Sequence, residues 1–127
     1  MSIIEKKFTA DIPKGYEVVN NNVRVVGVFK RLVHVKEFVR GREQTLSFEP
    51  ERESHHDNNA IAVYGSYTKR NLMLYSSTKK TLLGYIPKDI AKHISDNNLI
   101  TLIQPYLTCA CATKDGCSVE FSIAIPH

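Results

Sequence analysis

Short runs of β-branched and aromatic residues recur along the chain, separated from one another by polar or turn residues. Side chains on a strand alternate between its two faces, so short runs of this composition indicate strands rather than helices. We predict strands at residues 23–30, 45–48, 60–64, 72–75, 81–86, 100–104, 107–112 and 118–125. This succession is typical of a mainly β (α+β) domain, built as a small barrel or sandwich with one or two helices.

Helical patterning is clear in one place. Pro87 has the fixed φ that suits a first helical turn, and Ile90, Ala91 and Ile94 follow as an apolar stripe. The segment 33–40 fits a helix and a strand equally well, so both assignments stay open.

A hairpin turn is predicted near the C-terminus. Asp115 and Gly116 both tolerate positive φ and therefore favour a two-residue loop between two strands. Such a loop would place Val119 opposite Ala112 and set large residues against small ones.

Length and composition limit the function. The chain has 127 residues, 17 Lys and Arg against 13 Asp and Glu, and a pI near 9.0. We expect a single domain over residues 1–127, which leaves no room for a motor, a kinase or a two-domain dinucleotide enzyme. A modest net charge of +4 permits a polyanionic partner.

The expected compartment is the cytoplasm. No apolar run approaches the ~20 residues that span a bilayer, and the first ten residues have no signal-peptide pattern. We therefore expect no membrane association. Cys109, Cys111 and Cys117 form an odd set within one short stretch, which is typical of reduced thiols.

Charge is distributed in blocks. Residues 24–42 carry six Lys or Arg and a single Glu, residues 43–57 are mostly acidic, and residues 58–96 are again basic. If the two basic blocks share a face, they form a cationic groove. Lys30, Arg31, Lys88 and Lys92 are then the candidate phosphate contacts.

Motifs for common catalytic chemistries are missing from the sequence. It contains no Walker loop, no G-x-G-x-x-G, no G-x-S-x-G and no H-E-x-x-H, and we expect no cofactor. The C-x-C-x₅-C cluster at 109–117 departs from zinc-knuckle spacing, so buried strand thiols are favoured over a zinc site with His93 or His127.

The densest set of acid–base groups is His55-His56-Asp57. With Glu51 or Glu53 it would suit a metal-dependent nuclease. Adjacent residues on an extended chain point in opposite directions, however, so a surface loop leading into a strand is the favoured interpretation.

Three motifs in order resemble the HIRAN domain. They are Val25-Val26-Gly27-Val28, then the strand entry Asp57-Asn58-Asn59-Ala60-Ile61-Ala62-Val63, then Leu83-Gly84-Tyr85-Ile86-Pro87 leading into the helix. The resemblance covers approximately residues 23–102 and is strongest at the strand entry. It implies a small OB- or SH3-like β-barrel with helical additions. Without an attached ATPase, the chain looks like the stand-alone type found in bacteria and phages.

In the best understood eukaryotic members of this family, the domain binds single-stranded DNA at its 3′ end through aromatic, acidic and basic side chains. By resemblance, Asp57 matches the acidic position that recognises the free hydroxyl, and His56 stands where a stacking tyrosine is usual. Phe29 and Lys30 replace an Arg-Tyr pair, so the aromatic has moved by one position. On a strand this shift leaves open whether Phe29 faces the core or the groove.

We therefore expect a non-enzymatic module that binds single-stranded DNA or 3′ ends, with a role in DNA repair or replication. A protein-interaction adaptor that has lost the DNA site is the alternative, and a metal-dependent nuclease is the least favoured. A protein partner such as an ATPase or nuclease fits each case. The candidate DNA-binding residues are Phe29, Lys30, Arg31, His56, Asp57, Tyr85, Lys88 and Lys92.

Overall fold

In the described part of the chain, two antiparallel sheets and two α-helices make up the fold, so the mainly β prediction is confirmed. The structure is a computed structural model that describes residues 3–51, 59–70 and 76–127. Within these residues, neither helix is long and apolar enough to cross a membrane.

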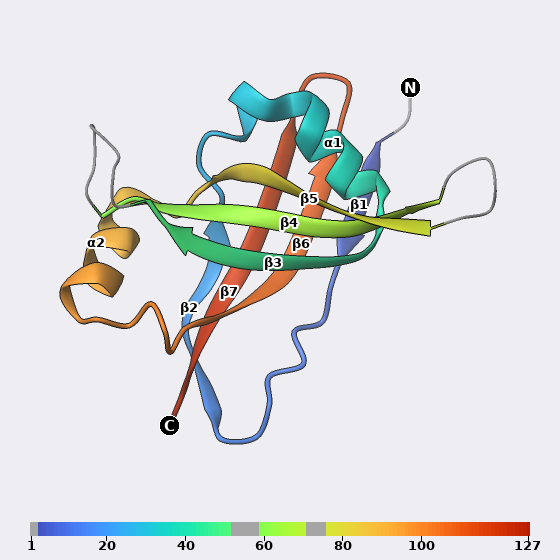
Figure 1. The fold of residues 1–127 in the computed structure, drawn as a ribbon. Coiled ribbons are helices and arrows are strands. Elements are labelled where there is room, and N and C mark those ends of the chain that lie inside the picture. The colour runs from blue at the N-terminus through green and yellow to red at the C-terminus, as the bar shows by residue number, and fades with distance from the viewer. Residues whose placement is uncertain (1–2, 52–58, 71–75) are drawn as a thin grey trace.

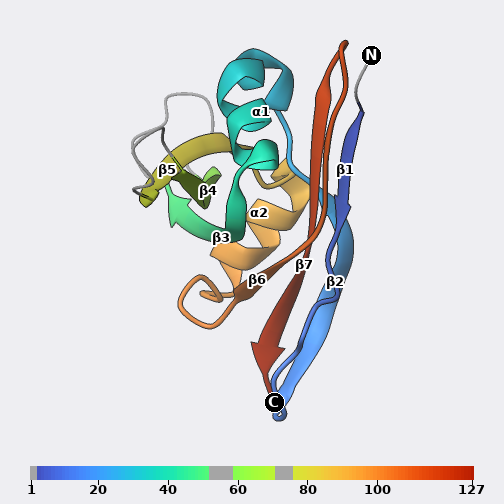
Figure 2. The ribbon, with the colours of Figure 1, turned by 90° about the vertical axis from the view of Figure 1, so that its right-hand side faces the viewer.

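One sheet has four strands in the order β1-β6-β7-β2, and the other has three in the order β3-β4-β5. The two sheets face each other as layers (Figure 2), and their strands run across one another in the view of Figure 1. The strands are β1 (Ile4–Lys7), β2 (Tyr16–Arg24), β3 (Arg42–Pro50), β4 (Ile61–Arg70), β5 (Ser76–Tyr85), β6 (Gln104–Ala112) and β7 (Cys117–Pro126).

The hydrophobic core fills the space between the layers. Phe48 of the three-stranded sheet packs against Phe121 of the four-stranded sheet, with ring centroids 5.3 Å apart. Phe121 and its strand neighbours Val119 and Ile123 are fully buried. Alternation along β7 therefore turns these large residues inward, as a sheet with one face in the core requires.

Two helices complete the fold. The segment 33–40, for which helix and strand fitted equally well, forms α1 (Leu32–Arg40), which packs against β5 and β6. Val35, Phe38 and Val39 are its buried residues, at the i, i+3 and i+4 positions of one helical face. Phe38 decides between the two assignments, because it shares the buried face only if the segment is helical.

The helix predicted after Pro87 is confirmed as α2 (Lys88–Asp96), with Pro87 as its N-cap residue. Its buried residues are Ala91 and Ile94. The helix lies at the opposite side of the three-stranded sheet from the end of α1 (Figure 1).

The predictions at 45–48, 107–112 and 118–125 lie within observed strands, and those at 60–64 and 81–86 exceed β4 and β5 by one residue each. Two predictions are wrong. Residues 23–30 are not one strand, because β2 ends at Arg24 and a 3-10 helix, η1 (Val28–Arg31), follows. Residues 100–104 form a turn up to the start of β6, held by bonds from Leu102 and Ile103 to the Leu99 carbonyl. The prediction for 72–75 lies outside the described residues.

The C-terminal hairpin differs from its prediction. Its loop has four residues, 113–116, because Cys117 pairs with Ala112 and Val119 pairs with Ala110. The hydroxyl of Thr113 accepts bonds from the backbone N–H groups of Asp115 and Gly116, both at 3.2 Å. A side-chain acceptor therefore stabilises the wider turn, and the positive φ of a two-residue loop is not needed.

Gly65 on β4 lies directly beneath α1. A Cβ placed there would be 2.6 Å from the Phe38 ring and 2.8 Å from Leu83, both of them fully buried. We expect Gly65→Ala to lower the free energy of unfolding by about 1–3 kcal/mol, because the overpacked core must shift. Urea denaturation measures this loss.

Gly116→Ala is the matched control, because a Cβ there meets nothing within 4 Å and the residue has no positive φ. Its stability should stay within about 0.5 kcal/mol of the parent. Equal urea midpoints for the two variants would show that Phe38 yields to the added methyl group.

Candidate nucleic-acid interface

A backbone bridge holds the first and third family-like motifs together. The N–H of Val26 donates to the Tyr85 carbonyl at 2.8 Å, and the N–H of Tyr85 donates to the Val26 carbonyl at 2.9 Å. Gly84 permits this approach, since a Cβ at that position would collide with the Val26 carbonyl. The sequence placed these segments about sixty residues apart, and the fold brings them into contact.

The chain turns sharply after this bridge. Gly27 adopts a φ of 86°, a left-handed conformation that favours glycine, and η1 begins immediately afterwards. Val28 packs against the core, whereas Phe29 has 69% of its surface exposed. Residues 28–31 form a helical turn, so the alternation of side chains along a strand does not decide where Phe29 points. Its exposure places the ring in solvent and not in the core.

The side chain of Arg31, the last residue of η1, lies over the ring of Tyr85. Its guanidinium lies 5.5 Å from the centroid of the tyrosine ring, a cation–π arrangement that we call the Arg31–Tyr85 stack. The same side chain donates to the Gly27 carbonyl at 3.1 Å. Arg31 and Tyr85, two of the predicted site residues, are thus brought together.

The hydroxyl of Tyr85 is held by an acid. It lies 3.1 and 3.2 Å from the two carboxylate oxygens of Glu51. Burial raises the pKa of Tyr85 above 10.0, and the hydrogen bond and charge of Glu51 raise it further, while Arg31 acts in the opposite direction. Glu51 is also fixed by its backbone, whose N–H donates to the Ala60 carbonyl at 2.9 Å.

A second cation–aromatic pair lies on the same sheet. The ammonium of Lys80 on β5 is 4.9 Å from the ring centroid of Tyr64 on β4, and it forms a 2.8 Å ion pair with Glu49 on β3. Tyr64 is close enough to Tyr85 for its charge to influence the pKa of that residue. Sequence reasoning missed Tyr64, Lys80, Glu49 and the role of Glu51, because their grouping depends on strand register.

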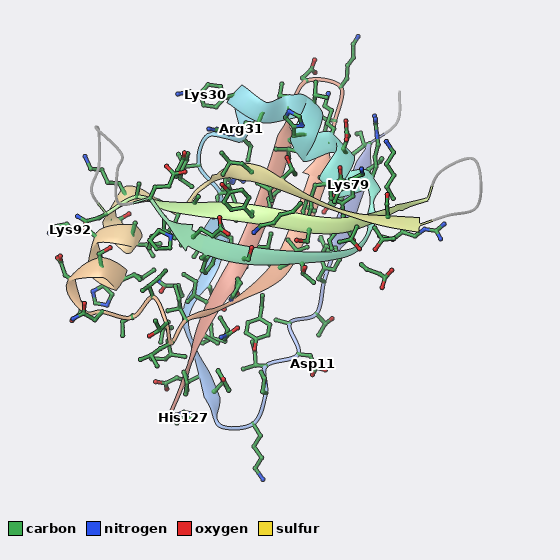
Figure 3. The ribbon with its side chains drawn as sticks, in the orientation of Figure 1. Asp11, Lys30, Arg31, Lys79, Lys92 and His127 are labelled. Atoms are coloured by element: carbon green, nitrogen blue, oxygen red, sulfur yellow. The ribbon has the colours of Figure 1, made fainter. Side chains whose placement is uncertain are left out.

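Phe29 and Lys30 extend from the turn into solvent. The Lys30 ammonium is 5.8 Å from the Phe29 ring, and both residues are exposed. Lys30 and Arg31 project from the start of the helical segment in Figure 3. An exposed aromatic ring beside a cation can stack on a base while the cation contacts a phosphate.

The two predicted lysines of α2, Lys88 and Lys92, differ in their partners. Lys88 is exposed, and no ion pair with another described residue holds it. Lys92 instead pairs with Asp96 at 2.9 Å one helical turn away, and this carboxylate raises the pKa of Lys92. His56 and Asp57, predicted for end recognition, lie outside the described residues.

The thiols show no metal-binding arrangement. Cys109, Cys111 and Cys117 are free and partly buried. Burial raises the pKa of both Cys109 and Cys117. In the part of the chain that the structure describes, no three His, Cys, Asp or Glu side chains are grouped to hold an ion. The nuclease hypothesis, which depends on residues 55–57, lies outside that part.

Comparisons with known proteins give no match to a family model, a curated protein or a solved structure. The chemistry of this surface must therefore be inferred from its own geometry. It combines exposed and partly exposed aromatic rings with cations from η1 and β5, close to two carboxylates. This combination suits binding to bases and phosphates more than covalent catalysis.

The tyrosine–glutamate contact predicts an alkaline dependence of stability. The pKa of Tyr85 is higher in the folded protein than the 10.0 of a free side chain, so folding favours the neutral hydroxyl. Its contribution is complete below about pH 10 and is lost as the pH rises through the raised pKa. We expect the free energy of unfolding to fall less between about pH 9 and pH 11 in Tyr85→Phe than in the parent.

Urea midpoints at the two pH values measure this difference. Glu51→Gln should also flatten the alkaline fall, since it removes a charge that raises the pKa of Tyr85. The same alkaline loss in the parent and Tyr85→Phe would contradict the assignment.

Proposed function

We propose that the chain is a non-enzymatic DNA-binding module that resembles the HIRAN domain and engages single-stranded DNA or exposed 3′ ends. The observation that carries the proposal is the turn at 27–31, which presents Phe29 and Lys30 to solvent beside the Arg31–Tyr85 stack. The order of the three motifs in the sequence supports the same assignment.

The energetics of single-strand binding fit such a surface. Stacking of a base on an aromatic side chain contributes roughly 1–3 kcal/mol, and it does not depend strongly on which base is stacked. Lys30 has no carboxylate partner among the described residues, so its charge is free for a phosphate. Binding of this kind weakens as salt is added, because counterions are released from the strand.

The proposal also covers the type of barrel, the cellular compartment and the partner of the chain. We infer that the two sheets, linked through Val26 and Tyr85, correspond to a small OB- or SH3-like β-barrel. The module would work in the cytoplasm, in DNA repair or replication, beside a partner such as an ATPase or nuclease. Three free thiols are compatible with a reducing compartment.

A protein-interaction adaptor is the second candidate, and exposed apolar side chains favour it. Val26, Phe29 and Val33 have 52%, 69% and 69% of their surfaces exposed within eight residues of chain. Apolar groups gathered in this way are used at protein interfaces as well as for stacking. Binding to DNA separates the two candidates.

Phe29→Ala should weaken binding to a short single-stranded oligonucleotide about fivefold or more, because one stacked base is lost. Fluorescence anisotropy at low and moderate salt measures the affinity. Val33→Ala is the matched control, since Val33 is equally exposed but lies on α1 beyond the turn. Equal losses in both variants would contradict a specific stacking role of Phe29. No DNA binding by the parent at low salt would favour the adaptor.

End recognition is tested at Asp57, the position that matches the hydroxyl-binding acid of the family. The parent should bind an oligonucleotide with a 3′ hydroxyl about tenfold more tightly than one with a 3′ phosphate, because a carboxylate accepts a bond from the former and repels the latter. Asp57→Asn should remove this preference. Binding without a preference in the parent would reduce the function to a general single-strand surface.

A further inference from the structure

A second polar region lies at the other end of the three-stranded sheet. It is a pocket of about 410 Å³ where α1 ends, β3 begins and β4 approaches its last residues. We call it the cationic pocket, and its lining includes Glu37, Arg40, Gly41, Arg42, Tyr67 and Lys69. Arg31 and Lys30 lie toward the opposite end of α1 in Figure 3, so this pocket is separate from the proposed DNA interface.

The wall of the pocket is closely packed. Tyr67 has 4% of its surface exposed, and its ring meets Phe38 edge to face with centroids 6.1 Å apart. The backbone of Gly41 lies against this ring so closely that a Cβ would be 2.5 Å from it. A wall built from a buried ring and a close backbone needs little reorganisation when a ligand binds.

The acceptors at the wall of the pocket receive hydrogen bonds from neighbouring groups. Glu37 is the one acid among the described lining residues, and it accepts a bond from the Tyr67 hydroxyl at 3.2 Å. The carbonyls of the last turn of α1, which would repel an anion, accept bonds from Gln44 and from the Gly41 N–H. Lys6 donates to the Gly41 carbonyl at 2.7 Å.

The three cations that line the pocket form no ion pair with any residue that the structure describes. They are Arg40, Arg42 and Lys69. Lys79, whose position is labelled in Figure 3, is the cross-strand neighbour of Tyr67. Residues 65–88 contain no Asp or Glu, so the hairpin strands β4 and β5 bring cations and no acids.

The positive charge of Arg42 affects the neighbouring residue Lys6. Burial lowers the pKa of its ammonium, and the positive charge of Arg42 lowers it further. Three lining cations against the single carboxylate of Glu37 leave an excess of positive charge. The cations repel one another, and an anion placed among them relieves that repulsion.

We propose that the cationic pocket binds the dianionic phosphate group of a phosphate monoester. Two arginines offer planar, multiple donors that match phosphate oxygens, and a lysine adds a third charge. The volume exceeds that of one phosphate and leaves room for part of the attached molecule beside Tyr67. A free phosphate monoester and the 5′ phosphate of a DNA strand present the same group.

The test titrates the full chain with inorganic phosphate, a nucleoside 5′-monophosphate, and one oligonucleotide with either a 5′ phosphate or a 5′ hydroxyl. Calorimetry gives affinities, and backbone amide shifts of Gly41 and Thr68 locate the ligand. Arg42→Gln and Lys69→Gln should each weaken phosphate binding at least about tenfold, because each removes a charge-assisted contact. Lys14→Gln, an equal charge change on the exposed β1–β2 connection, should leave it within about twofold.

The titrations also identify the source of the phosphate. Stronger binding of the 5′-phosphorylated strand than of the same strand with a 5′ hydroxyl, with the difference lost in Arg42→Gln, assigns the pocket to strand ends. Equal binding of the two strands, together with saturable binding of the mononucleotide, assigns it to small phosphate monoesters. Failure of every phosphate form to bind saturably at millimolar concentration, or equal affinity in the parent and Arg42→Gln, overturns the proposal. Phe29→Ala should leave inorganic phosphate binding unchanged, so failure here is distinct from failure of the DNA interface.

Discussion

Two backbone hydrogen bonds between Val26 and Tyr85 join the four-stranded sheet to the three-stranded one. The preceding residue, Val25, donates to Val119 of β7 at 2.9 Å, so neighbouring peptide groups bond to different sheets. Such bonds contribute only about 0.5–1.5 kcal/mol each in net terms, yet they fix where the chain must turn. The direction of η1, the stacking of Arg31 and the exposure of Phe29 all depend on that turn.

Much of the fold follows from local patterning. The alternation at 45–48, the compact apolar run at 60–64 and the strand-like run at 107–112 are enough to find three strands. Pro87 marks the start of its helix with a fixed dihedral angle. The wrong predictions concern segments whose structure is decided by contacts that the hydrophobic pattern does not show. Residues 23–30 include four valines, but Gly27 interrupts the segment with a positive φ that no periodicity reveals. At 113–116 the hydroxyl of Thr113 selects the turn, and the Asp-Gly dipeptide does not.

The candidate site is less predictable because it is assembled across strands. Arg31 and Tyr85 were identified from charge and motif, whereas Tyr64 and Lys80 become neighbours only through the β4–β5 register. That register includes a shift between Val63 and Tyr64, where Leu83 of β5 is passed over, so residue counting along the sequence does not align the two strands. The cationic pocket was equally hidden, since it joins the end of one helix to a hairpin about thirty residues away. The charge blocks in the sequence identified segments rich in Lys and Arg, but they did not show that these segments lie together at the pocket.

The bond from the Glu51 N–H to the Ala60 carbonyl continues the pairing of β3 with β4 beyond Pro50 and Ile61. The side chain of the same residue accepts the bond from the Tyr85 hydroxyl. Any residue except proline can make the backbone bond, so an exchange at position 51 keeps this strand pairing and releases only the tyrosine. Position 51 therefore allows the hold on Tyr85 to be tuned separately from the scaffold.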